Sequence, residues 1–125
     1  MRQLAQNRDG LIVGLTGASA VLLGAFGAHA LKGTLDTSHS ELWHTAVQYH
    51  FWHALALAGT ALCDAGKARR VAMLAFVVGI AMFSGSLYAL ALGAPRWMGI
   101  VTPFGGVAFI LGWIALGTAL KQRLS

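Results

Sequence analysis

Long stretches without Asp, Glu, Lys or Arg dominate the pattern of this chain. These uncharged stretches cover residues 10–31, 42–63, 71–95 and 97–120. Each meets or exceeds the roughly 20 residues that an α-helix needs to cross a hydrocarbon core about 30 Å thick. The pattern therefore predicts an all-α integral membrane protein, with one four-helix transmembrane domain over residues 1–125. The expected helices cover about residues 10–31, 41–63, 71–92 and 103–120.

Local signals mark the expected ends of these helices. Asp9 is placed to cap the N-terminus of the first helix, and Gly33 favours its end. Glu41 is expected in the first turn of the second helix, where a carboxylate interacts favourably with the helix dipole. Gly93 should end the third helix, and Thr102–Pro103 is typical of an N-cap followed by proline at the first helical position of the fourth.

The basic residues gather at the predicted helix ends. The formal net charge is +5. One side of the membrane is expected to hold Arg2, Arg8, Lys67, Arg69, Arg70, Lys121 and Arg123, and the other Lys32 and Arg96. The positive-inside rule then predicts cytoplasmic termini and a cytoplasmic middle loop. These charges indicate topology and the lipid bilayer as partner, and we expect no binding of nucleic acid.

The first apolar segment shares features with a secretory signal, because a basic lead-in precedes it and Ala28-His29-Ala30 matches a small-residue cleavage site. Its apolar run is longer than the core of about 7–15 residues that such signals have. We therefore expect the segment to remain as the first transmembrane helix.

Small residues recur at helical spacing on two of the expected helices. They are Gly14, Gly17, Gly24 and Gly27 on the first helix, and Ala81, Gly85, Ala89 and Gly93 on the third. Small side chains allow close helix packing, which matters because lipid supplies no hydrophobic drive for helix pairing. These faces are expected to pack either inside the bundle or against another protein. Trp43 and Trp97 are expected at the membrane interface, where aromatic residues are enriched.

Polar residues within the spans are costly in a membrane, so they are the candidates for function. Tyr49 and His53 are four residues apart, and His50 and His53 three apart, so each pair shares a helix face. With Thr45 and Thr60 they form a stripe expected to face the third helix. The candidate polar path or ligand site consists of His53, Tyr49, His50, Ser84, Tyr88 and His29.

Two interpretations of this stripe stay open. It could be a proton relay or a small polar ligand site, or its histidines could be neutral and donate interhelical hydrogen bonds. The second interpretation is favoured because the spans contain no carboxylate, the usual companion of proton coupling.

No recognised metal, cofactor or catalytic pattern is present in the sequence. A metal would need three or four convergent ligands, and the spacing of His29, His39 and His44 with Asp36 or Glu41 fits no known pattern. The histidine pair at matched depth, His29 with His44, is too close to water to favour haem. Hydrolase, phosphate-loop and Cys–His nucleophile patterns are missing too. We therefore expect no metal, no cofactor and no enzyme activity.

Five ordered motifs carry a family resemblance. They are Gly24-Ala-Phe-Gly-Ala-His-Ala-Leu31, Trp43-His-Thr-Ala-Val-Gln-Tyr49 with His53-Ala-Leu-Ala-Leu57, Phe83-Ser-Gly-Ser-Leu-Tyr88, Thr102-Pro-Phe-Gly-Gly106 and Gly112-Trp113. Together they resemble the YgdD-like family of small inner-membrane proteins, known as domain of unknown function 423. The resemblance implies a four-helix, multi-pass protein of the bacterial inner membrane, or of the mitochondrial inner membrane in a eukaryote. It implies no activity. It favours His53 over His50, because some relatives carry glutamine at the position of His50.

The expected function is that of a non-catalytic accessory or scaffolding subunit of a membrane assembly. Its partner would be a larger membrane complex or further copies of the chain. One alternative is a small transporter or channel, with His53, Tyr49 and Ser84 along a polar path. Another is binding of quinone or lipid near the outer surface, between Tyr88 and Trp97.

Overall fold

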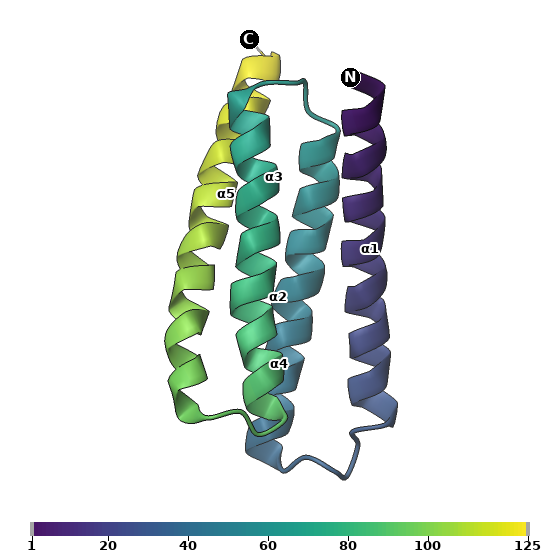
Figure 1. Cartoon of the computed structure of the whole chain (residues 1–125), viewed down its shortest axis with the longest axis vertical. Coiled ribbons are helices and arrows are strands. Elements are labelled where there is room, and N and C mark those ends of the chain that lie inside the picture. The colour runs from purple at the N-terminus through teal and green to yellow at the C-terminus, as the bar shows by residue number, and fades with distance from the viewer. Residues whose placement is uncertain (1, 125) are drawn as a thin grey trace.

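A computed structural model describes residues 2–124, which form an all-α bundle of four helical columns (Figure 1). The α-helices are α1 (Arg2–His29), α2 (Thr37–Ala61), α3 (Lys67–Gly79), α4 (Gly85–Ala91) and α5 (Val101–Leu124). One π-helical turn, Ile80–Ser84, joins α3 to α4 in a single column, and a 3₁₀ helix, Arg96–Ile100, leads into α5. Both ends of the chain lie at the same end of the bundle as the connection between α2 and α3 (Figure 1). The predicted four-helix, all-α architecture is confirmed.

All four helical columns begin earlier than expected, including the third, which begins at Lys67 and not near residue 71. Asp9 does not cap α1, because the helix already begins at Arg2, and its carboxylate pairs with Arg69 instead. The second helix begins at Thr37, and Asp36 is its N-cap, accepting a 2.8 Å hydrogen bond from the backbone N–H of His39. Thr102–Pro103 lies within α5, which the 3₁₀ helix already precedes. The predicted end at Gly93 is confirmed, since this glycine has a φ of +101°, a conformation that glycine adopts without strain.

Within the described residues, three helical stretches are long and apolar enough to cross a membrane. They are Gln6–His29, Lys67–Ala91 and Arg96–Arg123. α2, at 25 residues, has the length of a span but carries more polar side chains. Three of these, His50, His53 and Thr60, are buried. These polar groups face other helices, and α2 contacts α1, α3 and α4. α2 is therefore the inner helix of the bundle.

α2, α3 and α5 form the close-packed part of the protein. Phe76 and Leu57 are fully buried between them. Glycines allow the α3–α5 contact, because a Cβ at Gly112 would lie 2.7 Å from the Phe76 ring and one at Gly79 would overlap Phe109. The Cβ of any residue at Gly105 would likewise overlap the backbone of Phe83 in the π-helical turn. The core thus depends on direct backbone proximity between α5 and the α3–α4 column.

α1 is the peripheral helix. Only 6% of the residues in its most apolar stretch are buried, against 44% of those in the corresponding stretch of the α3–α4 column. Its main contacts are with α2, through Ala20 and through residues near the far end of the bundle. Most of the α1 surface is therefore available to lipid or to another protein.

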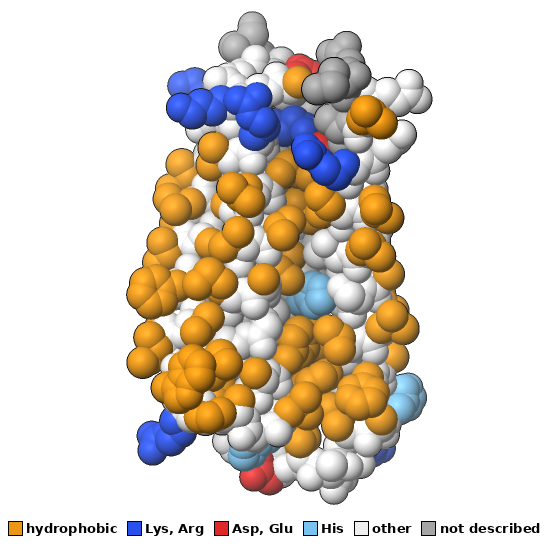
Figure 2. Space-filling model, viewed as in Figure 1, with side chains coloured by type: hydrophobic (Ala, Val, Ile, Leu, Met, Phe, Trp, Pro, Cys, Tyr) orange, Lys and Arg blue, Asp and Glu red, His pale blue; other side chains and the backbone are white. Residues whose placement is uncertain are grey.

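The surface carries the charge pattern expected of a membrane protein. Figure 2 shows an apolar band around the middle of the molecule, with most visible Lys and Arg side chains gathered at the end that holds both chain termini. The predicted grouping of the basic residues is therefore seen in space. Assignment of this end to the cytoplasm remains a prediction of the positive-inside rule.

Candidate functional site

His50 is the centre of a polar cluster that joins three helical columns. Its Nδ1 lies 2.8 Å from the hydroxyl of Tyr88 on α4, and its Nε2 lies 3.1 Å from both Ser19 Oγ and the carbonyl of Thr16 on α1. The side chain itself is buried. Because a carbonyl only accepts hydrogen bonds, Nε2 carries a proton, and in the neutral ring Nδ1 accepts from the Tyr88 hydroxyl. The cluster couples α1 to the core of the bundle.

His53 lies in a separate environment, between α2 and α5. Its Nδ1 donates to the carbonyl of Tyr49 at 2.7 Å, and its Nε2 accepts a 3.1 Å hydrogen bond from the indole N–H of Trp113. The imidazole also stacks on Phe109, with ring centroids 3.6 Å apart. Both ring nitrogens are used, so the neutral ring has no free position for a further ligand or proton acceptor.

The other predicted residues do not join these two histidines into a path. The Ser84 hydroxyl donates to the carbonyl of Ala46 at 2.7 Å. The Tyr49 ring packs against Phe83 and stacks with His53. His29 is exposed at the end of α1 and lies outside both clusters. The structure thus brings together His50 and Tyr88, and separately His53 and Tyr49.

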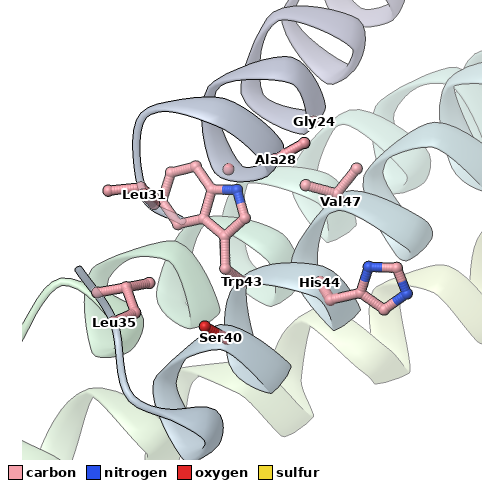
Figure 3. A pocket seen from close by; sticks show the side chains of 9 residues that line it. Gly24, Ala28, Leu31, Leu35, Ser40, Trp43, His44 and Val47 are labelled. Atoms are coloured by element: carbon pink, nitrogen blue, oxygen red, sulfur yellow. The ribbon is translucent and has the colours of Figure 1, made fainter. Parts of the chain in front are cut away.

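Trp43 is not the interfacial anchor that the sequence predicted. Its side chain is buried between α1 and α2, where the indole N–H donates to the carbonyl of Leu23 at 2.9 Å. Figure 3 shows the indole beside Ala28 and Leu31, in the wall of a cavity of about 280 Å³. Gly27 leaves the space for this ring, because a Cβ there would overlap it. Trp97, by contrast, is exposed as expected.

Tyr88 also points inward, where it contacts Trp43 and His50 and lies apart from the exposed Trp97. A ligand site formed jointly by Tyr88 and Trp97 therefore finds no support in their arrangement. In the part of the chain that the structure describes, no three His, Cys, Asp or Glu side chains gather at a distance suited to a metal ion.

Sequence reasoning missed the partners that hold these histidines. Thr16 and Ser19 come from α1, and Trp113 comes from α5. In the sequence, Gly112–Trp113 stands out only as part of the family pattern. The ion pair between Asp9 and Arg69, with an N–O distance of 2.9 Å, was also missed. A carboxylate next to the first apolar run and an arginine before the third were the available signals.

The profile of a family described as "protein of unknown function (DUF423)" matches residues 23–106, which extend from α1 into α5. This match covers more than half of the chain. The chain belongs to the DUF423 family. The predicted family is thus confirmed, and His50 and Tyr88 lie within the matched region, whereas their partners Thr16 and Ser19 precede it.

Bacterial relatives of this DUF423 protein match over most of their own length. The UPF0382 membrane protein YwdK of Bacillus subtilis is 44% identical over 84% of this chain and 89% of its own. The UPF0382 membrane protein of Haemophilus influenzae is 38% identical over 89% and 91%. The UPF0382 inner membrane protein YgdD of Escherichia coli is 37% identical over 82% and 81%. The chain is therefore a multi-pass protein of the bacterial inner or cell membrane. No solved structure matches it.

Proposed function

We propose that this DUF423 protein is a non-catalytic accessory or scaffolding subunit that binds its partner within the membrane through the outer face of α1. The observation that carries the proposal is a row of small, exposed residues on this peripheral helix. The interior of the bundle supports it as well, because its polar groups are engaged in holding the helices together.

The arrangement of the buried polar groups supports a role in helix packing more than a catalytic or transport role. Within the described residues, every buried side-chain nitrogen and oxygen has a hydrogen-bond partner. His50 and His53 are held by different helices and share no partner. A continuous polar path would require groups that can exchange partners from one end of the bundle to the other. The transporter alternative therefore has less support than the accessory role.

The outer face of α1 carries Gly10, Gly14 and Ala18, which lie four residues apart and are exposed. A Cβ at Gly10 or Gly14 would meet none of the described atoms within 4 Å, so these glycines do not serve packing inside the bundle. A row of small residues at this spacing permits the close approach of another transmembrane helix. Gly85 on α4 is open in the same sense.

The test compares copurification of wild type, Gly14→Leu and Gly117→Leu from native membranes in mild detergent, with quantitative mass spectrometry. Gly117 on α5 is a matched control, because a Cβ there also meets no described atom within 4 Å. Gly24→Leu is unsuitable, since a Cβ at Gly24 already lies 3.3 Å from Val47 and the change would disturb the α1–α2 contact.

The expected result is a stoichiometric partner with wild type and Gly117→Leu, and its loss with Gly14→Leu. The partner is either a different membrane protein or a second copy of this chain, and the mass spectrum distinguishes them. Retention of the partner by Gly14→Leu at wild-type amounts would remove the role of this face. Isolation of the wild-type protein as a lone monomer would overturn the accessory function.

A further inference from the structure

A cleft opens between α1 and α3 at the end of the bundle that holds both termini. Its volume is about 510 Å³. Ile12 of α1 and Met73, Leu74 and Val77 of α3 form its apolar part. The arginines at the mouth of the cleft belong to the basic end of the molecule, which lies above the apolar band in Figure 2. The cleft is therefore apolar toward the middle of the membrane and basic at the membrane surface.

One arginine of the cleft is neutralised and fixed. Arg69 pairs with Asp9 at 2.9 Å, and the two side chains are 15% and 11% exposed. The Arg69 guanidinium also donates to the carbonyl of Ala61 at 3.0 Å. This arrangement ties α1, α2 and α3 together and gives the cleft a defined wall.

Two further arginines at the mouth keep their charge available. Arg8 has a 73% exposed side chain and lies 3.9 Å from Asp9, a carboxylate that Arg69 holds more closely. Among residues 2–124, no acidic side chain pairs with Arg70, which is exposed. The lining contains three arginines against one aspartate, so it carries an excess of positive charge.

We propose that this cleft binds one anionic phospholipid, with the phosphate at Arg8 and Arg70 and the upper part of one acyl chain against Ile12, Leu74 and Val77. Basic pockets between transmembrane helices are suited to anionic headgroups, and arginine forms paired hydrogen bonds with phosphate oxygens. A free phosphate would leave the apolar wall unused. A zwitterionic lipid such as phosphatidylcholine also has a phosphate, but its cationic choline group would offset the phosphate charge beside Arg8 and Arg70.

This lipid site is independent of the partner face proposed above. With about 100° of rotation per residue, Arg8 and Ile12 lie on the opposite side of α1 from Gly10 and Gly14. The anionic lipid and a partner helix can therefore bind α1 at the same time, and the variants that test one surface leave the other intact.

The test is native mass spectrometry of the purified full-length protein, titrated separately with phosphatidylglycerol and phosphatidylcholine. The wild-type protein should bind its first phosphatidylglycerol at least about 10-fold more tightly than phosphatidylcholine. Arg8→Gln with Arg70→Gln should remove most of this preference, since each cationic side chain near a membrane surface contributes about 5-fold in affinity for an anionic lipid. Lys121→Gln, at the same end but outside the cleft lining, is the charge control and should leave the preference unchanged.

A second pair of variants tests the apolar wall. Val77 and Val78 are 36% and 37% exposed, but only Val77 lines the cleft. Val77→Trp should therefore fill the cleft and weaken phosphatidylglycerol binding, whereas Val78→Trp should not. Helicity and unfolding temperature of each variant establish that the fold is kept. This valine pair decides the question by itself if the double arginine variant does not fold.

Several results would overturn the proposal. Equal wild-type affinity for the two lipids would exclude recognition of charge. An effect of Lys121→Gln as large as that of the double arginine change would point to general surface charge. Unchanged binding in Val77→Trp would exclude the cleft, and displacement of the lipid by millimolar inorganic phosphate alone would indicate a simple anion site.

Discussion

His50 and Tyr88 connect α2 to α4 through a 2.8 Å contact between the imidazole Nδ1 and the phenol hydroxyl. The opposite ring nitrogen of His50 contacts the carbonyl of Thr16, so the proton of the neutral ring belongs on Nε2. His53 has the reverse arrangement, because its Nδ1 contacts the carbonyl of Tyr49 and its Nε2 faces the N–H of Trp113. Two histidines one helical turn apart are thus held as opposite tautomers.

The first prediction concerns these tautomers. Nitrogen NMR of histidine-labelled protein in lipid should show a protonated Nε2 for His50 and a protonated Nδ1 for His53. Tyr88→Phe should shift the Nδ1 signal of His50 and leave the His53 signals unchanged, because only His50 loses a hydrogen-bond donor. It should lower the free energy of unfolding by about 0.6 kcal/mol, the average for interhelical hydrogen bonds in membranes. The same tautomer at both histidines would contradict this assignment.

The second prediction concerns the hydrogen bond between Trp113 and His53. Trp113→Phe should lower the free energy of unfolding by about 0.6–1.7 kcal/mol, because His53 Nε2 loses its donor. Trp52→Phe is a matched control, since Trp52 is 51% exposed against 49% for Trp113 and its indole makes no hydrogen bond among the described residues. Detergent-induced unfolding followed by circular dichroism measures both. Equal effects of the two changes would show that loss of ring area, and not the hydrogen bond, is responsible.

Helix number and order could be predicted from the sequence because uncharged runs of sufficient length are a local property. The role of Asp9 near the first helix start could not, because it depends on a partner far away in the sequence. Asp9 has the sequence context of an N-cap, yet its carboxylate forms an ion pair with Arg69, in the first turn of α3. A charged residue at the edge of an apolar run is therefore ambiguous until its partner is known.

The candidate site was predicted in its residues but not in its pairings. Helical spacing shows that His50 and His53 share a face of α2, but not which neighbour each one meets. The same limit applies to glycine. The spacing of Ala81, Gly85 and Ala89 predicted a packing face but not the partner it meets, and a Cβ at Gly85 meets no described atom within 4 Å. The π-helical turn at Ile80–Ser84, for which no local signal was recognised, separates this face from the α5 contact made by Gly79.

The third prediction concerns the contact of α5 with the π-helical turn. Gly105→Ala should destabilise the protein by about 1–3 kcal/mol, because the new Cβ overlaps the backbone of Phe83 and the helices must move apart. Gly117→Ala on the same helix should cause no loss of stability, since no described atom lies within 4 Å of its Cβ position. Unfolding free energies of the two variants provide the measurement. Full stability of Gly105→Ala would show that the helices are not in direct backbone contact.

The fourth prediction concerns the start of α2. The Asp36 carboxylate accepts hydrogen bonds from the backbone N–H and then from the ring Nδ1 of His39, and these hold its pKa below the ordinary value of 3.8. A lowered pKa means that the cap stabilises the helix above pH 3.8 and is lost as the pH falls through the lower value of the folded state. Amide-exchange protection of the first turn should therefore decrease in acid. Asp36→Asn keeps a capping side chain that does not titrate. The same acid-dependent loss in Asp36→Asn would exclude Asp36 as its source.

The fifth prediction concerns the ion pair between α1 and α3. Asp9→Asn leaves a guanidinium, 15% exposed, without its carboxylate, and should lower the free energy of unfolding by about 3 kcal/mol. Asp64→Asn is the matched control and should cost less than about 1 kcal/mol, because Asp64 is 78% exposed and 3.9 Å from Arg123. Asp9→Asn combined with Arg69→Gln should recover part of the loss, since no unpaired charge then remains at the contact. If Asp9→Asn costs no more than Asp64→Asn, the position of α1 must depend on its contacts with α2, which include the hydrogen bonds of His50 and of Trp43, and Ser19→Ala would then become the decisive variant.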